Sequence, residues 1–115
     1  YPTEHRTRDL HDKKMKFWLD DLRPMPEEFH LWVKTPEECI QAIQETKKID
    51  LISFDHDLGG DLTAIPVAEY LEAGAYHKTL PKIQWKIHSM NPIGRKNLER
   101  ILKRADRFWN GDMAP

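Results

Sequence analysis

The chain has 115 residues, of which 39% are hydrophobic and 32% are charged, and its formal net charge is −1. This length supports one hydrophobic core and excludes two ordinary domains. No apolar run approaches the roughly 20 residues of a membrane helix, and no apolar signal-peptide core is present, so we expect a cytoplasmic protein with no membrane partner.

The first third of the chain is predicted to contain an unstructured segment and two strands. Residues 1–14 are polar and aperiodic, so we expect a disordered extension, native or added, ahead of one domain over residues 15–115. The apolar run "KFWL" (16–19) predicts a buried strand, and "FHLWV" (29–33) predicts a second one.

Three amphipathic segments predict helices. They span residues 35–48, 61–75 and 91–109. Thr35 and Asn91 are each followed by proline, which is the order expected of an N-cap and the first helical residue. Asp61 is predicted to cap the middle helix, and Cys39 is predicted to be a packed thiol on the apolar side of the first helix.

Two further strands are predicted between these helices. The segment "IDLISF" (49–54) is apolar and β-branched, as in a central parallel strand, whereas "KIQWKIH" (82–88) alternates and should be less buried. Strands that alternate with helices predict an α/β three-layer sandwich with a mainly parallel sheet and helices on both faces. In a strand order of 2-1-3-4, the carboxyl ends of the first and third strands border one crevice.

Polar and titratable side chains follow three of the predicted strands. They are Asp20 and Asp21 after the first strand, Asp55, His56 and Asp57 after the third, and His88, Ser89 and Asn91 after the fourth. Turn and cap chemistry explains many such aspartates. Crowded carboxylates are also tolerated when a hard cation lies between them, and Mg²⁺ prefers carboxylate, water and phosphate oxygens. Imidazoles exchange protons with a phosphoryl group near neutral pH, so the combination predicts a phosphate-processing site with Mg²⁺.

The charges are distributed unevenly along the chain. Residues 1–76 contain 9 Lys and Arg against 16 Asp and Glu, whereas residues 77–115 contain 9 against 3. An acidic half followed by a basic half suits a divalent cation beside a phosphate-bearing ligand, although a solvated basic helix is the simpler explanation of the basic half. The helix that starts after Asn91 would add free backbone amides, which form an anion site, at the same sheet edge.

Three blocks of the sequence resemble a known family. "FWLDDLRPMP", "LISFDHDLGG" and "IHSMNPIGRKNL" are similar, in this order, to the signature blocks of cyclic-phosphate-processing receiver-like domains. The resemblance covers most of residues 16–105 and implies a CheY-like fold. It also implies that the chain processes a cyclic phosphate, either a cyclic nucleotide or a 2′,3′-cyclic phosphate end of RNA.

The resemblance also implies roles for individual residues. Asp20 and Asp21 fall on the acidic pair that holds Mg²⁺ in receivers, and Asp55 falls on the phospho-accepting aspartate. Arg23 falls on the family's arginine and is expected to clamp a phosphate with its planar guanidinium. Gly94 is expected to leave room for the ligand or for a close backbone approach. The positions particular to the family are His56, Asp57, His88, Ser89 and Asn91.

Two features depart from an ordinary receiver. After residue 105 only "DRFWNGDMAP" follows, without the lysine that contacts the phosphoryl group, so a fifth strand is expected to be missing or degenerate and phosphorelay signalling is disfavoured. The segment after "DLGG" also lacks the glycine that we expect to open the next helix in relatives.

Three functions are compatible with these residues. The first is a phosphoesterase in which Asp20, Asp21 and Asp55 hold a metal ion. His56 and His88 would then act as acid and base beside Asp57, with Arg23, Ser89, Asn91 and Gly94 around the substrate. Asp55 would alternatively act as a nucleophile, and a mechanism in which the histidines act directly on the phosphate would not require the metal. The second function is a module that binds or sequesters a phosphorylated or nucleotide ligand without turnover. The third is a haloacid-dehalogenase-like phosphatase, whose aspartate motif would follow the first strand instead of the third.

Overall fold

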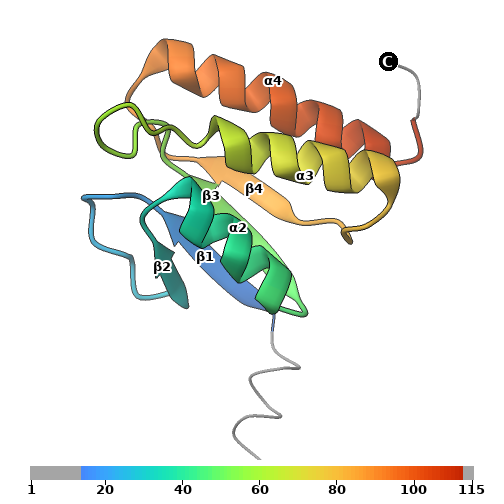
Figure 1. Cartoon of the computed structure of the whole chain (residues 1–115), viewed down its shortest axis with the longest axis horizontal. Coiled ribbons are helices and arrows are strands. Elements are labelled where there is room, and N and C mark those ends of the chain that lie inside the picture. Colours follow the sequence, from blue (N-terminus) through green and yellow to red (C-terminus); the bar gives the residue numbers. More distant parts are fainter. Residues whose placement is uncertain (1–13, 113–115) are drawn as a thin grey trace, which may run out of the picture.

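A computed structural model describes residues 14–112 of the chain. Its elements, in chain order, are β1 (Met15–Leu19), β2 (Leu31–Val33), α2 (Pro36–Glu45), β3 (Ile49–Phe54), α3 (Ile65–His77), β4 (Gln84–Ile87) and α4 (Pro92–Trp109) (Figure 1). The predicted disordered segment 1–14 lies outside the described residues except for Lys14. No helix within residues 14–112 combines the length and apolar character that crossing a lipid bilayer requires.

The four strands form one parallel sheet in the order β2-β1-β3-β4, and residues 14–112 form no fifth strand. The predicted α/β receiver-like fold and its strand order are therefore confirmed. Backbone bonds continue the ladder past the strand ends, because Asp55 N–H donates to the Leu19 carbonyl and His88 N–H donates to the Phe54 carbonyl. The residues that leave β1, β3 and β4 consequently start from one edge of the sheet.

The main core lies between the sheet and its helices. Phe17, Leu19, Ile52 and Phe54 point from β1 and β3 into this core and are fully buried. All three helices contribute to the same cluster, and α2 and α3 lie in front of the strands in Figure 1. The helix side chains with the deepest burial in this cluster are Cys39, Val67, Ala68, Leu71, Leu98 and Leu102. Every apolar stripe therefore packs on one face of the sheet.

The second face of the sheet carries Trp18 and Ser53, which are paired neighbours on β1 and β3. The prediction of helices on both faces of the sheet is wrong: in the described part of the chain β1 is joined to β2 by a loop, which packs on this second face where a helix was expected. Phe29 of that loop is 4% exposed and packs edge-on against Trp18, with ring centroids 5.1 Å apart. The loop that follows Asp20 is thus part of the fold.

The middle helix starts later than its sequence predicts. It begins at Ile65 with Ala64 as N-cap, and Asp61 is exposed in the preceding turn, so the predicted capping role of Asp61 is wrong. Two backbone bonds close the turn, from Leu58 N–H to the Leu62 carbonyl and from Leu62 N–H to the Gly59 carbonyl, and they keep residues 58–62 out of the helix. By contrast, Thr35 and Asn91 cap α2 and α4 as predicted.

Cys39 is predicted to resist thiol reagents while the protein is folded. Its side chain is fully buried, and burial raises the pKa of the thiol to about 12. The thiolate, which is the reactive species, is therefore scarce and shielded. We expect no reaction with Ellman's reagent at pH 8 in native buffer and one equivalent of reacted thiol in 6 M guanidinium. Reaction of the native protein within minutes would contradict this packing.

Candidate functional site

Three carboxylates meet where β1 and β3 end. Asp20, Asp21 and Asp55 each offer one oxygen, and these oxygens all lie within 4.8 Å of one another. They line a cleft of about 500 Å³. The other lining residues are Leu22, Arg23, Asp57, Gly59, Gly60, Ser89, Met90 and Asn91. The cleft therefore brings together the residues that follow β1, β3 and β4, as the sequence predicts.

The electrostatics of this cluster favour a bound cation. The pKa of Asp55 is raised, first by burial and then by the neighbouring Asp20 charge, although its hydrogen bond from His56 N–H opposes the rise. Such repulsion between carboxylates is relieved when a hard cation lies between them. Mg²⁺ prefers oxygen ligands such as carboxylates, so these three oxygens fit the Mg²⁺ that the resemblance to receivers implies.

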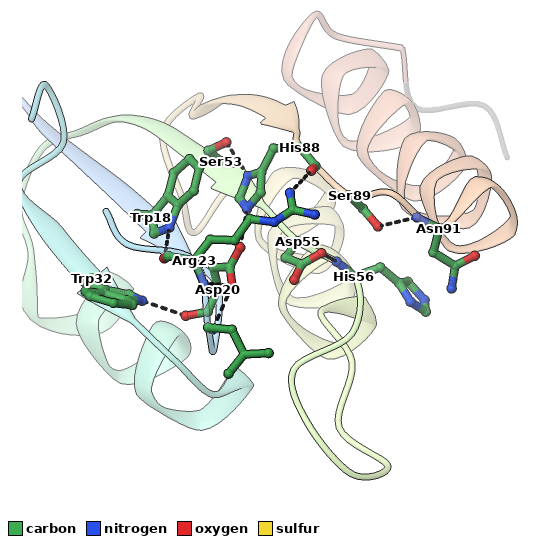
Figure 2. Close-up of polar contacts among 11 residues, drawn as sticks. Trp18, Asp20, Arg23, Trp32, Ser53, Asp55, His56, His88, Ser89 and Asn91 are labelled. Carbon is green, nitrogen blue, oxygen red and sulfur yellow. Dashed lines mark hydrogen bonds and ion pairs between the residues drawn. The ribbon is translucent and has the colours of Figure 1, made fainter. Parts of the chain in front are cut away.

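Asp20 is the most firmly held of the three carboxylates. It is 1% exposed, and its Oδ1 accepts hydrogen bonds from Leu22 N–H (2.9 Å) and Arg23 N–H (2.8 Å). Two indole groups fix the same loop: Trp18 Nε1–H donates to the Arg23 carbonyl, and Trp32 Nε1–H donates to the Asp20 carbonyl (Figure 2). The loop geometry thus sets the position of this carboxylate.

His88 lies under the loop, on the second face of the sheet. Its ring stacks on Trp18 with centroids 3.9 Å apart and planes 4° apart. Nδ1 lies 2.8 Å from Ser53 Oγ, and Nε2 lies 3.0 Å from Asp20 Oδ2 (Figure 2). Burial lowers the pKa of His88, although its contacts with Asp20 act in the opposite direction. Both ring nitrogens therefore have partners inside the protein, and His88 is not among the residues that line the cleft.

His56 points away from Asp20 and Asp55 and toward Asn91 at the start of α4 (Figure 2). Its Nδ1 lies 3.1 Å from Asp57 Oδ1, and the second oxygen of Asp57 accepts a hydrogen bond from Asn91 Nδ2 at 3.2 Å. The pKa of Asp57 is lowered, mainly by the bond from Asn91 and then by the bond from His56. Asp57 and Asn91 line the cleft whereas His56 does not, so the imidazole reaches the cleft through Asp57.

Gly94 provides the space in which the His56 ring lies, because a Cβ at this position would collide with three atoms of that ring. We expect Gly94→Ala to lower the free energy of unfolding by about 1–3 kcal/mol, although alanine is the better helix former by about 1 kcal/mol. Urea unfolding measures the effect, with Asn97→Ala, an exposed position of α4, as the matched control. Adding His56→Ala should restore most of the loss. A Gly94→Ala variant as stable as wild type would contradict the packing.

Of the remaining predicted residues, Ser89 and Asn91 line the wall formed after β4, and Arg23 reaches this wall from the loop after β1. Arg23 Nη1 donates to the His88 carbonyl at 2.8 Å, which places the guanidinium across the cleft from its own loop. Ser89 is 5% exposed, and its Oγ accepts a hydrogen bond from Asn91 N–H. Asn91 Oδ1 caps α4 by accepting bonds from Ile93 N–H and Gly94 N–H.

The sequence did not point to Ser53 and Trp32 as site residues. Ser53 Oγ contacts His88 Nδ1, and Trp32 Nε1–H donates to the Asp20 carbonyl. Ser53 is a fully buried hydroxyl within the mainly apolar strand β3, and that mismatch was the available signal. Trp32 carried no such signal, because aromatic residues are common in strands. Leu22 (80% exposed) and Met90 (79% exposed) were also not predicted as lining residues.

A parallel sheet of order 2-1-3-4 with an acidic cleft at its carboxyl edge defines the receiver-like class of α/β proteins. Within this class, a family model described as "Cyclic-phosphate processing Receiver domain" matches residues 15–104. The chain belongs to this family, which confirms the resemblance of its three sequence blocks. No curated protein and no solved structure matches the chain.

Proposed function

We propose that the cleft hydrolyses a cyclic phosphate ester, either a cyclic nucleotide or a 2′,3′-cyclic phosphate end. The observation that carries the proposal is the meeting of three carboxylates with Arg23, Ser89 and Asn91 in one cleft of a chain from this family. Carboxylates alone would repel a phosphate. A cation among them, and the guanidinium and amide donors opposite, supply the attraction that a phosphodiester needs.

Mg²⁺ is the proposed cofactor, and Asp20, Asp21 and Asp55 would hold it. When bound, such an ion neutralises charge on the phosphate oxygens. Arg23 lines the cleft and would orient the phosphate by donating to its oxygens. Ser89 and Asn91 complete that wall. The backbone amides expected to bind an anion at the start of α4 are not free, because Ile93 N–H and Gly94 N–H donate to Asn91 Oδ1 and Pro92 has no N–H.

Asp55 is the proposed general base. Asp55 lines the cleft, and a carboxylate that contacts the cation through one oxygen can take a proton from an adjacent water through the other. It would take a proton from the water that attacks phosphorus, while one ring P–O bond breaks. His56 would return a proton to the departing ring oxygen by way of Asp57. Asp57 lines the cleft, and its Oδ1 lies 3.1 Å from the imidazole Nδ1. The product is an acyclic phosphate monoester.

A second candidate function is binding of the same ligand without turnover. One observation favours it: both imidazoles have partners within the protein and neither lines the cleft. The haloacid-dehalogenase-like interpretation requires its aspartate motif after the first strand, whereas here Asp55 and Asp57 follow β3. We do not propose it.

A substrate panel tests the proposed hydrolysis. Cyclic 2′,3′-mononucleotides, cyclic 3′,5′-mononucleotides and a short RNA with a 2′,3′-cyclic end are incubated with the protein and Mg²⁺ or EDTA, and chromatography separates ester from monoester. We expect one ring type to be opened and EDTA to stop the reaction. Tight binding of a ligand that stays intact would support the second candidate, and turnover unaffected by EDTA would remove the metal from the proposal.

A further inference from the structure

Three side chains behind the cleft form one connected group on the second face of the sheet. Trp18 of β1 and Ser53 of β3 are paired neighbours, and His88 follows β4 directly. His88 stacks flat on Trp18 and contacts Ser53 Oγ on one side and Asp20 Oδ2 on the other. None of these three residues lines the cleft, yet the group ends on a carboxylate that does.

We propose that Ser53 and His88 are positioning residues that fix the Asp20 carboxylate for metal binding, with Trp18 as the platform that holds the imidazole ring flat. This inference rests on the metal site of the proposed function. It changes the expected role of His88 from an acid or base that acts on the substrate to a residue that acts through Asp20. It also assigns a role to Ser53, which the sequence did not single out.

The directions of the hydrogen bonds follow from the groups involved. An ionised carboxylate only accepts, so His88 Nε2–H donates to Asp20 Oδ2. In the neutral imidazole Nδ1 then accepts, and the Ser53 hydroxyl donates to it. The two backbone amides of Leu22 and Arg23 hold the other oxygen of Asp20. Both carboxylate oxygens are thereby fixed, which is how outer partners commonly orient a metal ligand.

Another role for this arrangement is excluded by burial. A serine, a histidine and an aspartate in hydrogen-bonded sequence also form the nucleophilic triad of hydrolases. Ser53, however, is 0% exposed within β3 and its hydroxyl cannot reach a substrate in the cleft. His88 has no ring nitrogen left for the substrate, because Ser53 and Asp20 occupy both. A role in holding Asp20 accounts for the contacts of both ring nitrogens of His88.

The test measures the affinity for Mn²⁺, used as a spectroscopic substitute for Mg²⁺, by the EPR signal of the free ion. Wild type is compared with Ser53→Ala, His88→Gln and the hydroxyl-removal control Thr79→Ala, which is exposed in the connection between α3 and β4. We expect Ser53→Ala and His88→Gln to raise the Kd by about 10-fold or more, as outer-partner substitutions do, and Thr79→Ala to leave it within twofold. Turnover of Ser53→Ala should recover at saturating Mn²⁺.

The outcomes separate this inference from the proposed function. Unchanged Mn²⁺ affinity in both variants, with turnover of His88→Gln reduced about 10²-fold or more, would identify His88 as an acid or base and overturn the positioning role. Weakened Mn²⁺ binding in a protein that hydrolyses no cyclic phosphate would support positioning and refute only the hydrolysis. Wild type that binds no Mn²⁺ would overturn both the metal site and the positioning.

A nitrogen NMR measurement provides a second readout that does not depend on how well His88→Gln folds. In wild type, long-range ¹H–¹⁵N spectra at pH 7 should show His88 as the neutral Nε2–H tautomer. In Ser53→Ala the Nδ1 resonance should move toward that of an imidazole nitrogen without a hydrogen bond. A His88 ring in the Nδ1–H tautomer in wild type would contradict the proposed direction of both bonds.

Discussion

Asp55→Asn is expected to lower turnover of the cyclic phosphate by about 10²- to 10⁴-fold, because the amide cannot take the proton of the attacking water and holds the cation less well than a carboxylate does. The fold should survive, since the asparagine carbonyl can still accept the hydrogen bond from His56 N–H that Asp55 accepts at 2.8 Å. Without divalent cation the variant should be at least as stable as wild type, because burial and the Asp20 charge both disfavour an ionised Asp55. Rate assays and thermal unfolding with EDTA measure the two effects.

The matched control for this substitution is Asp50→Asn at the other end of β3. Asp50 accepts a hydrogen bond from Gln84 Nε2 and lies outside the cleft, so its replacement should leave turnover within twofold. An Asp55→Asn variant with wild-type turnover would refute the general-base assignment. A variant that loses turnover but also unfolds at a much lower temperature would show that Asp55 contributes to the fold instead.

Asp20→Ala is expected to have the largest effect on stability, a loss of about 2–4 kcal/mol in the free energy of unfolding. The substitution leaves two backbone N–H groups and the His88 Nε2–H without their acceptor in a partly buried place. Relief from burying the Asp20 charge offsets part of this cost. Urea unfolding in EDTA measures the loss without a contribution from bound metal.

Asp20→Asn separates the hydrogen bonds from the charge. Its carbonyl oxygen can keep the bonds from Leu22 N–H and Arg23 N–H, and its amide can donate to His88 Nε2 once the imidazole adopts the other tautomer. We therefore expect a stability loss of about 1 kcal/mol and a large loss of metal affinity. Asp21→Ala is the control, because the Asp21 carboxylate has no hydrogen-bond partner among residues 14–112. Equal stability losses for Asp20→Ala and Asp21→Ala would contradict the structure of the loop.

The fold and the edge that carries the site could be predicted from the sequence because local signals agree there. The apolar run 49–54 matches β3 residue for residue, and Asn91 followed by proline marks the start of α4 correctly. Polar residues that follow parallel strands must leave the sheet at the same edge, so the approach of Asp20, Asp21 and Asp55 followed from the strand order alone. The late start of α3 was missed because backbone bonds in the turn at residues 58–62 outweigh the helical pattern.

The orientation of the histidine rings could not be predicted from the sequence. His88 leaves β4 on the face that the loop after β1 covers, and the partners that fix its ring, Trp18 and Ser53, come from two other strands. His56 turns toward α4 because Gly94 leaves space for its ring. Contacts of this kind depend on packing between segments distant in sequence, and periodicity and spacing do not record them.

Hydrolysis in H₂¹⁸O, followed by ³¹P NMR, tests the central claim most directly. The protein is mixed with a large excess of the ring type selected by the substrate panel and with Mg²⁺. We predict that many equivalents of monoester form per protein, each with one ¹⁸O on phosphorus, seen as an isotope shift of the new resonance. A cyclic ester that remains intact, while one equivalent is bound, would contradict hydrolysis and leave the cleft as a binding site.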